Sequence, residues 1–251
     1  AENRAMQENQ PSRTAMGAAT LRALHQILDK PTIFTDPLAL KIVGPEAEAE
    51  LCKRNDPRAE ETRPGLRAFI AARSRLAEDT LAEAVAQGVG QYVLLGAGLD
   101  TFAYLAAGSY PGLNVFEVDH PATQGWKRER LSGAGIAVPR GLTFAPVNFE
   151  TETLAHGLVR AGFDAAKPAV FAWLGVVPYL TQGAIDATLT FIASLPRGTT
   201  VIFDYGEPAS KRNAAAATAH KAMADRVAQS GEAFRSFFMR EGLKRHVASF
   251  G

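Results

Sequence analysis

Five short apolar runs alternate with helical segments along the middle of the chain, and this alternation restricts the fold more than any other feature. The runs are 92–95, 114–118, 142–149, 169–174 and 199–203, and the helical segments between them include 122–133, 152–162 and 183–195. Such runs are typical of parallel strands buried on both faces. The pattern predicts an α/β fold with a doubly wound, mostly parallel sheet, whose ligand lies at the carboxyl ends of the strands.

Helical patterns precede this region. The spacing of apolar residues predicts a helix over 14–29, and Asp36 with Pro37 predicts the cap and first turn of a short helix ending at residue 42. A longer helix is expected over 64–86, with Gly88 as its C-cap. The apolar residues expected on one side of that helix are Leu66, Phe69, Ile70, Leu76 and Leu81.

The chain also ends in helical patterns. Residues 208–229 are alanine-rich, and 234–249 predict a further helix that carries Phe234, Phe237 and Phe238. We expect one domain over 1–251, in which residues 91–206 form the core. Residues 1–90 and 207–251 are expected to be helical covers on the carboxyl edge of the sheet.

Composition excludes several classes of protein. The 251 residues carry a net charge of +1, which argues against a nucleic-acid-binding protein. The densest basic run, Lys127 to Arg130, is broken by Glu129, so we interpret it as a solvated helix face. Cys52 is the single cysteine, which leaves no disulfide and no thiolate zinc site, and we expect no metal.

The sequence also suggests a compartment. The first 13 residues are polar and show no signal peptide, and the longest apolar run, 169–180, is too short to span a bilayer. We therefore expect a cytoplasmic protein without a membrane partner. The oligomeric state stays open, with a homo-oligomer among the options.

A glycine-rich turn follows the first apolar run. Gly96, Ala97 and Gly98 would let a ligand approach the backbone before the next helix begins. A dinucleotide fingerprint would need a third glycine at position 101, which is Thr101. The turn therefore favours a nucleoside with a small charged tail over a dinucleotide, and a plain tight turn is the structural alternative.

An acidic residue ends the second apolar run. Glu117 and Asp119 share a face of the predicted strand, and Asp119 lies nearer its carboxyl tip. A carboxylate about 20 residues after such a turn can accept hydrogen bonds from ribose hydroxyls. The alternative is that Asp119 caps the helix that begins near Ala122.

These features belong to a longer series of short sequence motifs. The series is SRTA (12–15), FTDPLA (34–39), AARSR (71–75), YVLLGAGLDTFAY (92–104), FEVDHP (116–121), WKR (126–128), WLGV (173–176), YLT (179–181) and FDY (203–205). In this order it resembles class I S-adenosylmethionine-dependent methyltransferases with a Rossmann-like sheet, specifically the leucine carboxyl methyltransferase-like family with its bacterial small-molecule members.

The resemblance implies a cofactor site for S-adenosyl-L-methionine. Arg13 and Arg73 match arginines that hold the methionine carboxylate, a role that suits a guanidinium fork, although each could instead form a surface ion pair. We interpret Arg75 as such a surface pair. The other implied cofactor contacts are Gly96, Ala97 and Gly98 at the methionine portion, Asp119 at the ribose, Asn148 and Phe149 beside the adenine, and Trp173 and Leu174.

The chain departs from the family pattern at three places. Asn148 stands where relatives carry an acidic residue, and Leu105 stands where they often have arginine. The family sheet ends in a late antiparallel hairpin, whereas the residues after Gly206 read as helices. We therefore expect that C-terminal residues of the native protein are missing.

The resemblance implies methyl transfer to a carboxylate or hydroxyl of a small molecule, such as a secondary metabolite. The acceptor is expected beyond the fourth and fifth strands, near Tyr179, Asp204, Tyr205 and Trp173, each of which could instead be core packing. No obvious general base accompanies the motifs, and His120 reads as a polar residue at the strand tip, which favours a carboxyl acceptor. The alternatives are a nicotinamide-dependent oxidoreductase and a non-catalytic binding module.

Overall fold

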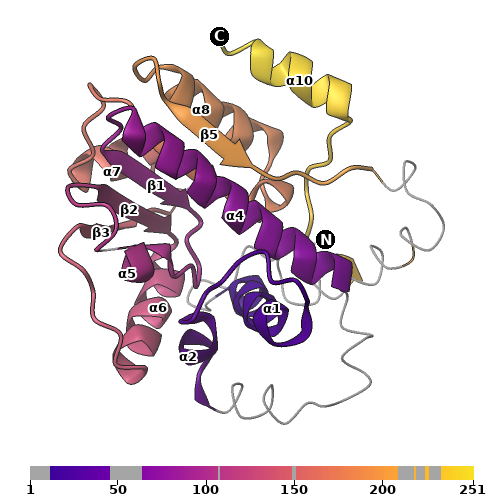
Figure 1. Ribbon diagram of the computed structural model, residues 1–251. Coiled ribbons are helices and arrows are strands. Elements are labelled where there is room, and N and C mark those ends of the chain that lie inside the picture. Colours follow the sequence, from indigo (N-terminus) through magenta and orange to yellow (C-terminus); the bar gives the residue numbers. More distant parts are fainter. Residues whose placement is uncertain are drawn as a thin grey trace.

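The computed structural model describes residues 12–45, 64–106, 108–148, 151–208, 218, 224–225 and 233–251. Within these residues the chain forms one five-stranded sheet with helices on both faces (Figure 1). No helix in these ranges has the length and apolar character needed to cross a membrane.

The sheet confirms the predicted α/β architecture. All four strand pairings are parallel, and the strand order is β3-β2-β1-β4-β5. The strands are β1 (Gln91–Leu95), β2 (Asn114–Asp119), β3 (Leu142–Pro146), β4 (Val170–Trp173) and β5 (Thr200–Phe203). Every residue of β1 and β4 is buried, which explains why these strands read as continuous apolar runs.

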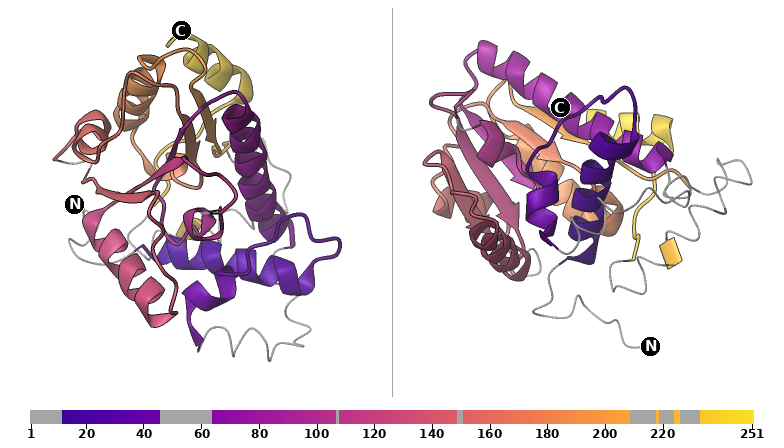
Figure 2. Two further views of the ribbon diagram at one scale, coloured as in Figure 1. Left: turned by 60° about the vertical axis from the view of Figure 1, so that its left-hand side comes forward. Right: turned by 60° about the horizontal axis from the view of Figure 1, so that its bottom comes forward.

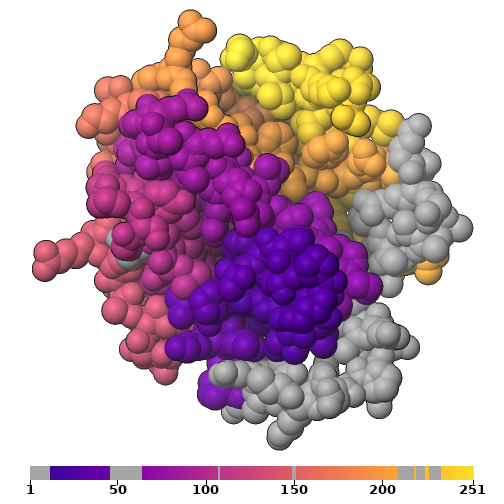
Figure 3. Space-filling view, in the orientation of Figure 1, coloured from indigo at the N-terminus to yellow at the C-terminus, as the bar shows by residue number. Residues whose placement is uncertain are grey.

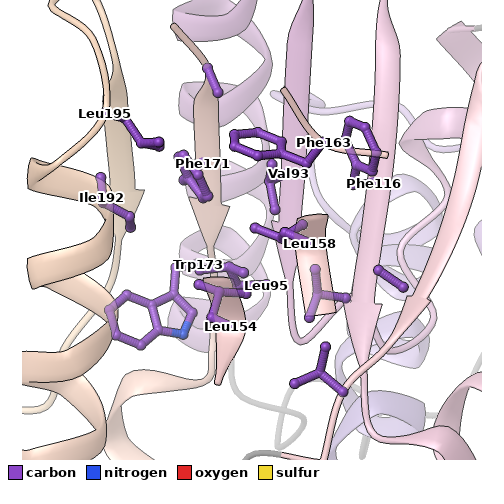
Figure 4. Packing of buried hydrophobic residues seen from close by; sticks show 14 of the residues in the cluster. Val93, Leu95, Phe116, Leu154, Leu158, Phe163, Phe171, Trp173, Ile192 and Leu195 are labelled. Carbon is purple, nitrogen blue, oxygen red and sulfur yellow. The ribbon is translucent and has the colours of Figure 1, made fainter. Parts of the chain in front are cut away.

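The helices divide between the two faces of the sheet. On one face, α7 (Leu154–Arg160) and α8 (Gln182–Ala193) pack against alternate residues of the central strands, including Val93, Phe116 and Phe171 (Figure 4). On the other face, α4 (Pro64–Ala86) and α5 (Phe102–Ala106) cover the intervening residues, including Leu94 and Val115, and α6 (Pro121–Gly133) lies beside β3. This arrangement is doubly wound, and its switch point lies between β1 and β4.

The N-terminal helices lie at the carboxyl ends of the strands. Helix α1 (Arg13–Leu28) and helix α2 (Ala39–Val43) are packed against each other at that end of the sheet (Figures 1 and 2). Figure 3 shows this segment packed without a break against α4. Helices α1 and α2 therefore lie at the expected ligand edge, whereas α4 covers a face of the sheet, so a single cover formed by residues 1–90 stays a prediction.

Two details of the N-terminal helices differ from the prediction. The short helix begins at Ala39 and not at Pro37, because residues 37 and 38 form a turn before it. Oδ1 of Asp36 accepts from the N–H of Leu38 in that turn, while Oδ2 accepts from the side chain of Arg22. In α4, Phe69 and Leu76 are 46% and 57% exposed, while Arg67 and Ser74 are buried. The predicted apolar side of α4 was therefore correct for Ile70 and Leu81 and wrong for Phe69 and Leu76.

The last helix is shorter than predicted. Helix α10 covers Arg240–Ala248, and residues 233–239, with the three phenylalanines, are not helical. The N–H groups of Arg235 and Phe238 donate to the carbonyls of Pro178 and Gly206, so these tertiary bonds replace helical ones. Most of the helix expected over 208–229 lies outside the described residues. In the described part of the chain no antiparallel strand follows β5.

Candidate functional site

The loop that follows β1 approaches its neighbours closely at both glycines. Gly96 and Gly98 have φ of +67° and +46°, a region that favours glycine. A Cβ at Gly96 would lie 2.4 Å from Cγ2 of Val176, and one at Gly98 would lie 2.9 Å from Cβ of Ala15. The loop is thus a tight turn, and it is also packed between the loop after β4 and the start of α1.

Asp119 joins this loop to the end of β2. Its Oδ2 accepts from the backbone N–H of Gly98 at 2.6 Å, and its Oδ1 accepts from the N–H of His120 at 2.7 Å. Burial raises the pKa of the Asp119 carboxyl, and the two N–H groups partly oppose that rise. Helix α6 is capped by His120, whose Nδ1 accepts from Ala122, so Asp119 is not the side-chain cap.

A buried ion pair lies next to Asp119 on the same face of β2. Nζ of Lys127 lies 2.7 Å from Oε2 of Glu117, both side chains are at most 2% exposed, and the Tyr104 hydroxyl donates to the same oxygen at 3.4 Å. Burial raises the pKa of Glu117 to about 7, although the ammonium of Lys127 favours ionisation. Oε1 of Glu117 has no hydrogen-bond partner among the described residues.

This pair corrects the interpretation of the basic run as a solvated face. Lys127 is 1% exposed and points at the sheet. The guanidinium groups of Arg128 and Arg130 lie over the rings of Phe144 and Trp126. Only part of this run therefore faces solvent.

Arg73 reaches the other side of the switch point from α4. Its Nη1 donates to Oδ2 of Asp204 at 2.8 Å, just past the end of β5, and Oδ1 of Asp204 accepts from the N–H of Gly175. The guanidinium also lies 5.7 Å from the ring centroid of Phe69. The structure therefore brings together Arg73 and Asp204, which the sequence assigned to cofactor and acceptor. By contrast, Arg75 forms the expected exposed pair, with Asp79.

The remaining predicted cofactor residues lie near the carboxyl edge of the sheet, and they differ in solvent exposure. Arg13 is exposed at the first position of α1, and Ala97 is buried with its N–H donating to Val118. Asn148 follows β3, where its carbonyl accepts from two later N–H groups, and Phe149 lies outside the described residues. Trp173 is 2% exposed and packs within the core cluster (Figure 4).

The predicted acceptor residues contact aromatic neighbours. The ring of Tyr179 lies 5.1 Å from that of Phe234, and Tyr205 packs against the core cluster as a partly buried residue. Leu174, a predicted cofactor contact, is also partly buried, and it packs against the core cluster on the other face of the sheet. The ring of Trp173 packs against Phe203 at 6.1 Å, so this side chain contributes to the core.

Sequence reasoning missed a buried network that fastens α1 to the loop after β1. Arg22 donates from Nε to Asp36 at 2.9 Å and from Nη2 to the carbonyl of Leu99 at 2.7 Å. Thr101 donates to the same Asp36 oxygen at 2.6 Å. The available signal was Arg22 itself, a charged residue at helical spacing among the apolar residues of α1.

Comparison with known proteins gives consistent matches. The family model for leucine carboxyl methyltransferase matches residues 15–193. A Bacillus subtilis protein, YktD, provisionally named an S-adenosyl-L-methionine-dependent methyltransferase, is 30% identical over 98% of this chain and 88% of its own length. A Frankia alni protein with the same provisional name is 34% identical, and the match covers 72% of this chain and 64% of that protein.

Solved structures share the fold. A DUF574 family protein from Streptomyces avermitilis superposes with a TM-score of 0.58 at 14% identity, over 96% of this chain and 83% of that one. A protein from Thermobifida fusca, provisionally described as a methyltransferase, gives a TM-score of 0.55 at 18% identity, over 92% and 78%. At such low identity these two likenesses show the architecture alone.

Proposed function

Since the chain belongs to the leucine carboxyl methyltransferase family, we propose that it transfers a methyl group to a carboxylate or hydroxyl oxygen of a small molecule in secondary metabolism. The family match and the relatives identify it as an S-adenosyl-L-methionine-dependent methyltransferase. The oxygen acceptor and its metabolic setting are the proposed part.

The residues at the carboxyl edge suit this cofactor. Asp119 offers a carboxylate to the ribose hydroxyls, and the loop of Gly96 and Gly98 lies beside it, since the N–H of Gly98 donates to its Oδ2. Arg73 offers a guanidinium to the methionine carboxylate, with Arg13 as a further cation at the start of α1. Asn148 is proposed beside the adenine, where its side-chain oxygen can accept from the amino group.

The hydrogen bonding of His120 supports a mechanism in which the protein aligns the acceptor with the methyl group and supplies no general base. Its Nδ1 already accepts from the N–H of Ala122 as the cap of α6, so that nitrogen is not available to take a proton from an acceptor. When bound, the cofactor supplies an electrophilic methyl group on a sulfonium. A carboxylate acceptor is already ionised near neutral pH and needs no base, whereas a phenol or alcohol would profit from one. The protein then mainly has to orient the acceptor and exclude water.

The acceptor is proposed to lie near Tyr179 and Tyr205, beyond β4 and β5. Both are only partly buried: Tyr179 is the last residue of a short 3-10 helix (Val177–Tyr179) after β4, and Tyr205 lies two residues past the end of β5. Their rings would give a planar acid an apolar surface with a hydroxyl at its edge. Trp173 contributes to this region from the core, where its ring packs against Phe203.

A methyl-transfer assay over a panel of aromatic acids, phenols and amines tests this proposal. We expect turnover with one or more acids or phenols and none with the amines. With a carboxylic acid, kcat should stay level from about pH 6 to pH 9, since the acceptor is ionised throughout. Turnover of amines alone would contradict the proposal.

A further inference from the structure

We propose that Asp204 is a positioning residue for the cofactor, which holds the guanidinium of Arg73 against Gly175 so that its free edge faces the methionine carboxylate. This inference rests on the proposed contact between Arg73 and that carboxylate. It differs from the sequence-based expectation, in which Asp204 contacts the acceptor.

Both carboxylate oxygens of Asp204 accept a hydrogen bond from the protein. Oδ2 accepts from Nη1 of Arg73 at 2.8 Å, and Oδ1 accepts from the backbone N–H of Gly175. The side chains of Arg73 and Asp204 are 16% and 14% exposed, so the pair is largely shielded from water. Asp204 therefore links the ends of β4 and β5 to α4 through a single carboxylate.

The guanidinium of Arg73 is held on more than one side. A Cβ at Gly175 would lie 2.8 Å from Nη2 and 2.9 Å from Nη1, so the group is packed directly against this glycine. The ring of Phe69, one helical turn earlier on α4, lies 5.7 Å from Cζ. Among the described residues Nη2 and Nε have no hydrogen-bond partner, which leaves these donors for a second carboxylate.

Gly175 fits this role through its backbone as well. Its φ is +72°, which is unfavourable for other residues, and its N–H is the donor that fixes Oδ1 of Asp204. A methyl group here would meet only the flexible end of Arg73 and would push the guanidinium away. Substituting Gly175 thus provides a second way to disturb Arg73 that leaves the Asp204 side chain intact.

The test compares two ligands that differ in the carboxylate. S-adenosylhomocysteine carries the amino-acid portion, and 5′-methylthioadenosine lacks it. By calorimetry, the wild-type protein should bind the first more tightly. Asp204→Asn should weaken S-adenosylhomocysteine at least tenfold and change methylthioadenosine by less than twofold, and Gly175→Ala should show the same pattern. The matched control is Asp79→Asn, which removes the carboxylate of the exposed Arg75 pair on the same helix and should change neither affinity.

Each other outcome has a definite meaning. Unchanged or tighter S-adenosylhomocysteine binding by Asp204→Asn would overturn the inference, as would an equal loss for both ligands in both variants, which indicates a general effect on the fold. Unchanged binding together with slower methyl transfer would indicate that Asp204 contacts the acceptor, and this result would also overturn the inference. If the wild-type protein did not distinguish the two ligands, the proposed contact of Arg73 with the cofactor would itself fail.

Discussion

At the scale of single residues, Asp119 is the side chain whose contribution to cofactor binding can be measured most directly. We expect Asp119→Ala to weaken S-adenosylhomocysteine binding by roughly 1.5–3 kcal/mol, the value of hydrogen bonds to a charged group. Calorimetry with the purified variant measures this. An unchanged affinity would remove Asp119 from the site.

The pH dependence of that affinity follows from the same carboxylate. Burial raises the pKa of Asp119 above the ordinary 3.8, and the ionised form is the better acceptor for ribose hydroxyls. Affinity should therefore fall as the pH drops through the raised pKa. In Asp119→Asn this acid-side fall should be reduced, which titration calorimetry at several pH values can check.

The buried Glu117–Lys127 pair predicts a pH-dependent loss of stability. Lys127→Met leaves a buried carboxylate without its cation, which costs about 3–5 kcal/mol at pH 8. The pKa of Glu117, about 7 in the fold against 4.5 unfolded, means that its proton stabilises the fold fully below pH 4.5 and that this stabilisation is lost as the pH rises through about 7. In the variant the carboxyl can protonate at pH 5, so the cost should be smaller there than at pH 8.

Urea unfolding at the two pH values measures this difference. The control is the double variant Glu117→Gln/Lys127→Met, in which neither charge is buried. It should recover much of the stability and lose this part of the pH dependence. An equal loss at both pH values in Lys127→Met would show that the pair does not set the titration.

The same pair shows where residue-level prediction from sequence reached its limit. Asp119 was singled out because a carboxylate at the end of a buried strand can bind a ribose. The structure places this carboxylate against the N–H of Gly98, and its contact with a ribose stays a prediction. Lys127 was interpreted as solvated because charge runs usually are, yet it lies four residues before the buried Leu131. A charged Glu117 in an apolar strand was the sign that a buried cation had to face it.

At the scale of elements, the network of Arg22 and Asp36 fastens α1 to the loop after β1. Arg22→Met would leave Asp36, 1% exposed, without its ion pair and the Leu99 carbonyl without its donor. We expect the free energy of unfolding to fall by about 3–5 kcal/mol, because an uncompensated charge stays buried. Chemical denaturation gives this value.

A comparison with Arg75→Met separates this effect from the loss of any arginine pair. Arg75 and Asp79 are both more than half exposed, so breaking their pair should leave the unfolding curve unchanged. Similar losses of unfolding free energy in the two variants would mean that the Arg22 network does not hold α1 against the loop after β1. The Arg22 variant should also bind S-adenosylhomocysteine less tightly, because Leu99 directly follows Gly98.

Element prediction succeeded where the signal was local and failed where distant backbone groups competed. The helix over 64–86 was predicted with its bounds, because its pattern and Gly88, at φ +93°, are local. The helix over 234–249 was predicted too long, because residues 235–238 bond to Pro178 and Gly206. Such partners are far away in the sequence, and helical spacing says nothing about them. The division into covers and core at residues 90 and 206 stays a prediction.

At the scale of the whole molecule, the candidate site is made by every layer of the fold. Asp119 comes from β2, the glycine loop from β1, Arg73 from α4 and Asp204 from the end of β5, while α1 lies over the loop. The strand alternation alone predicted this common edge, because a doubly wound sheet collects its carboxyl ends on one side. It did not predict that Gly96 would contact Val176, or Gly98 Ala15, so closely, because such contacts depend on packing.

A ligand held by all of these elements should stabilise the protein as one unit. At about 100 times its dissociation constant, S-adenosylhomocysteine should add roughly 2.7 kcal/mol to the free energy of unfolding. For a chain of this size that corresponds to a rise in Tm of roughly 5–10 °C, measurable by calorimetric melting. NAD at the same concentration should give no rise, because position 101 is threonine and the dinucleotide turn is incomplete. Equal rises in Tm with both ligands would show that the site recognises only the adenosine portion that they share. A rise in Tm with NAD only would contradict the cofactor assignment.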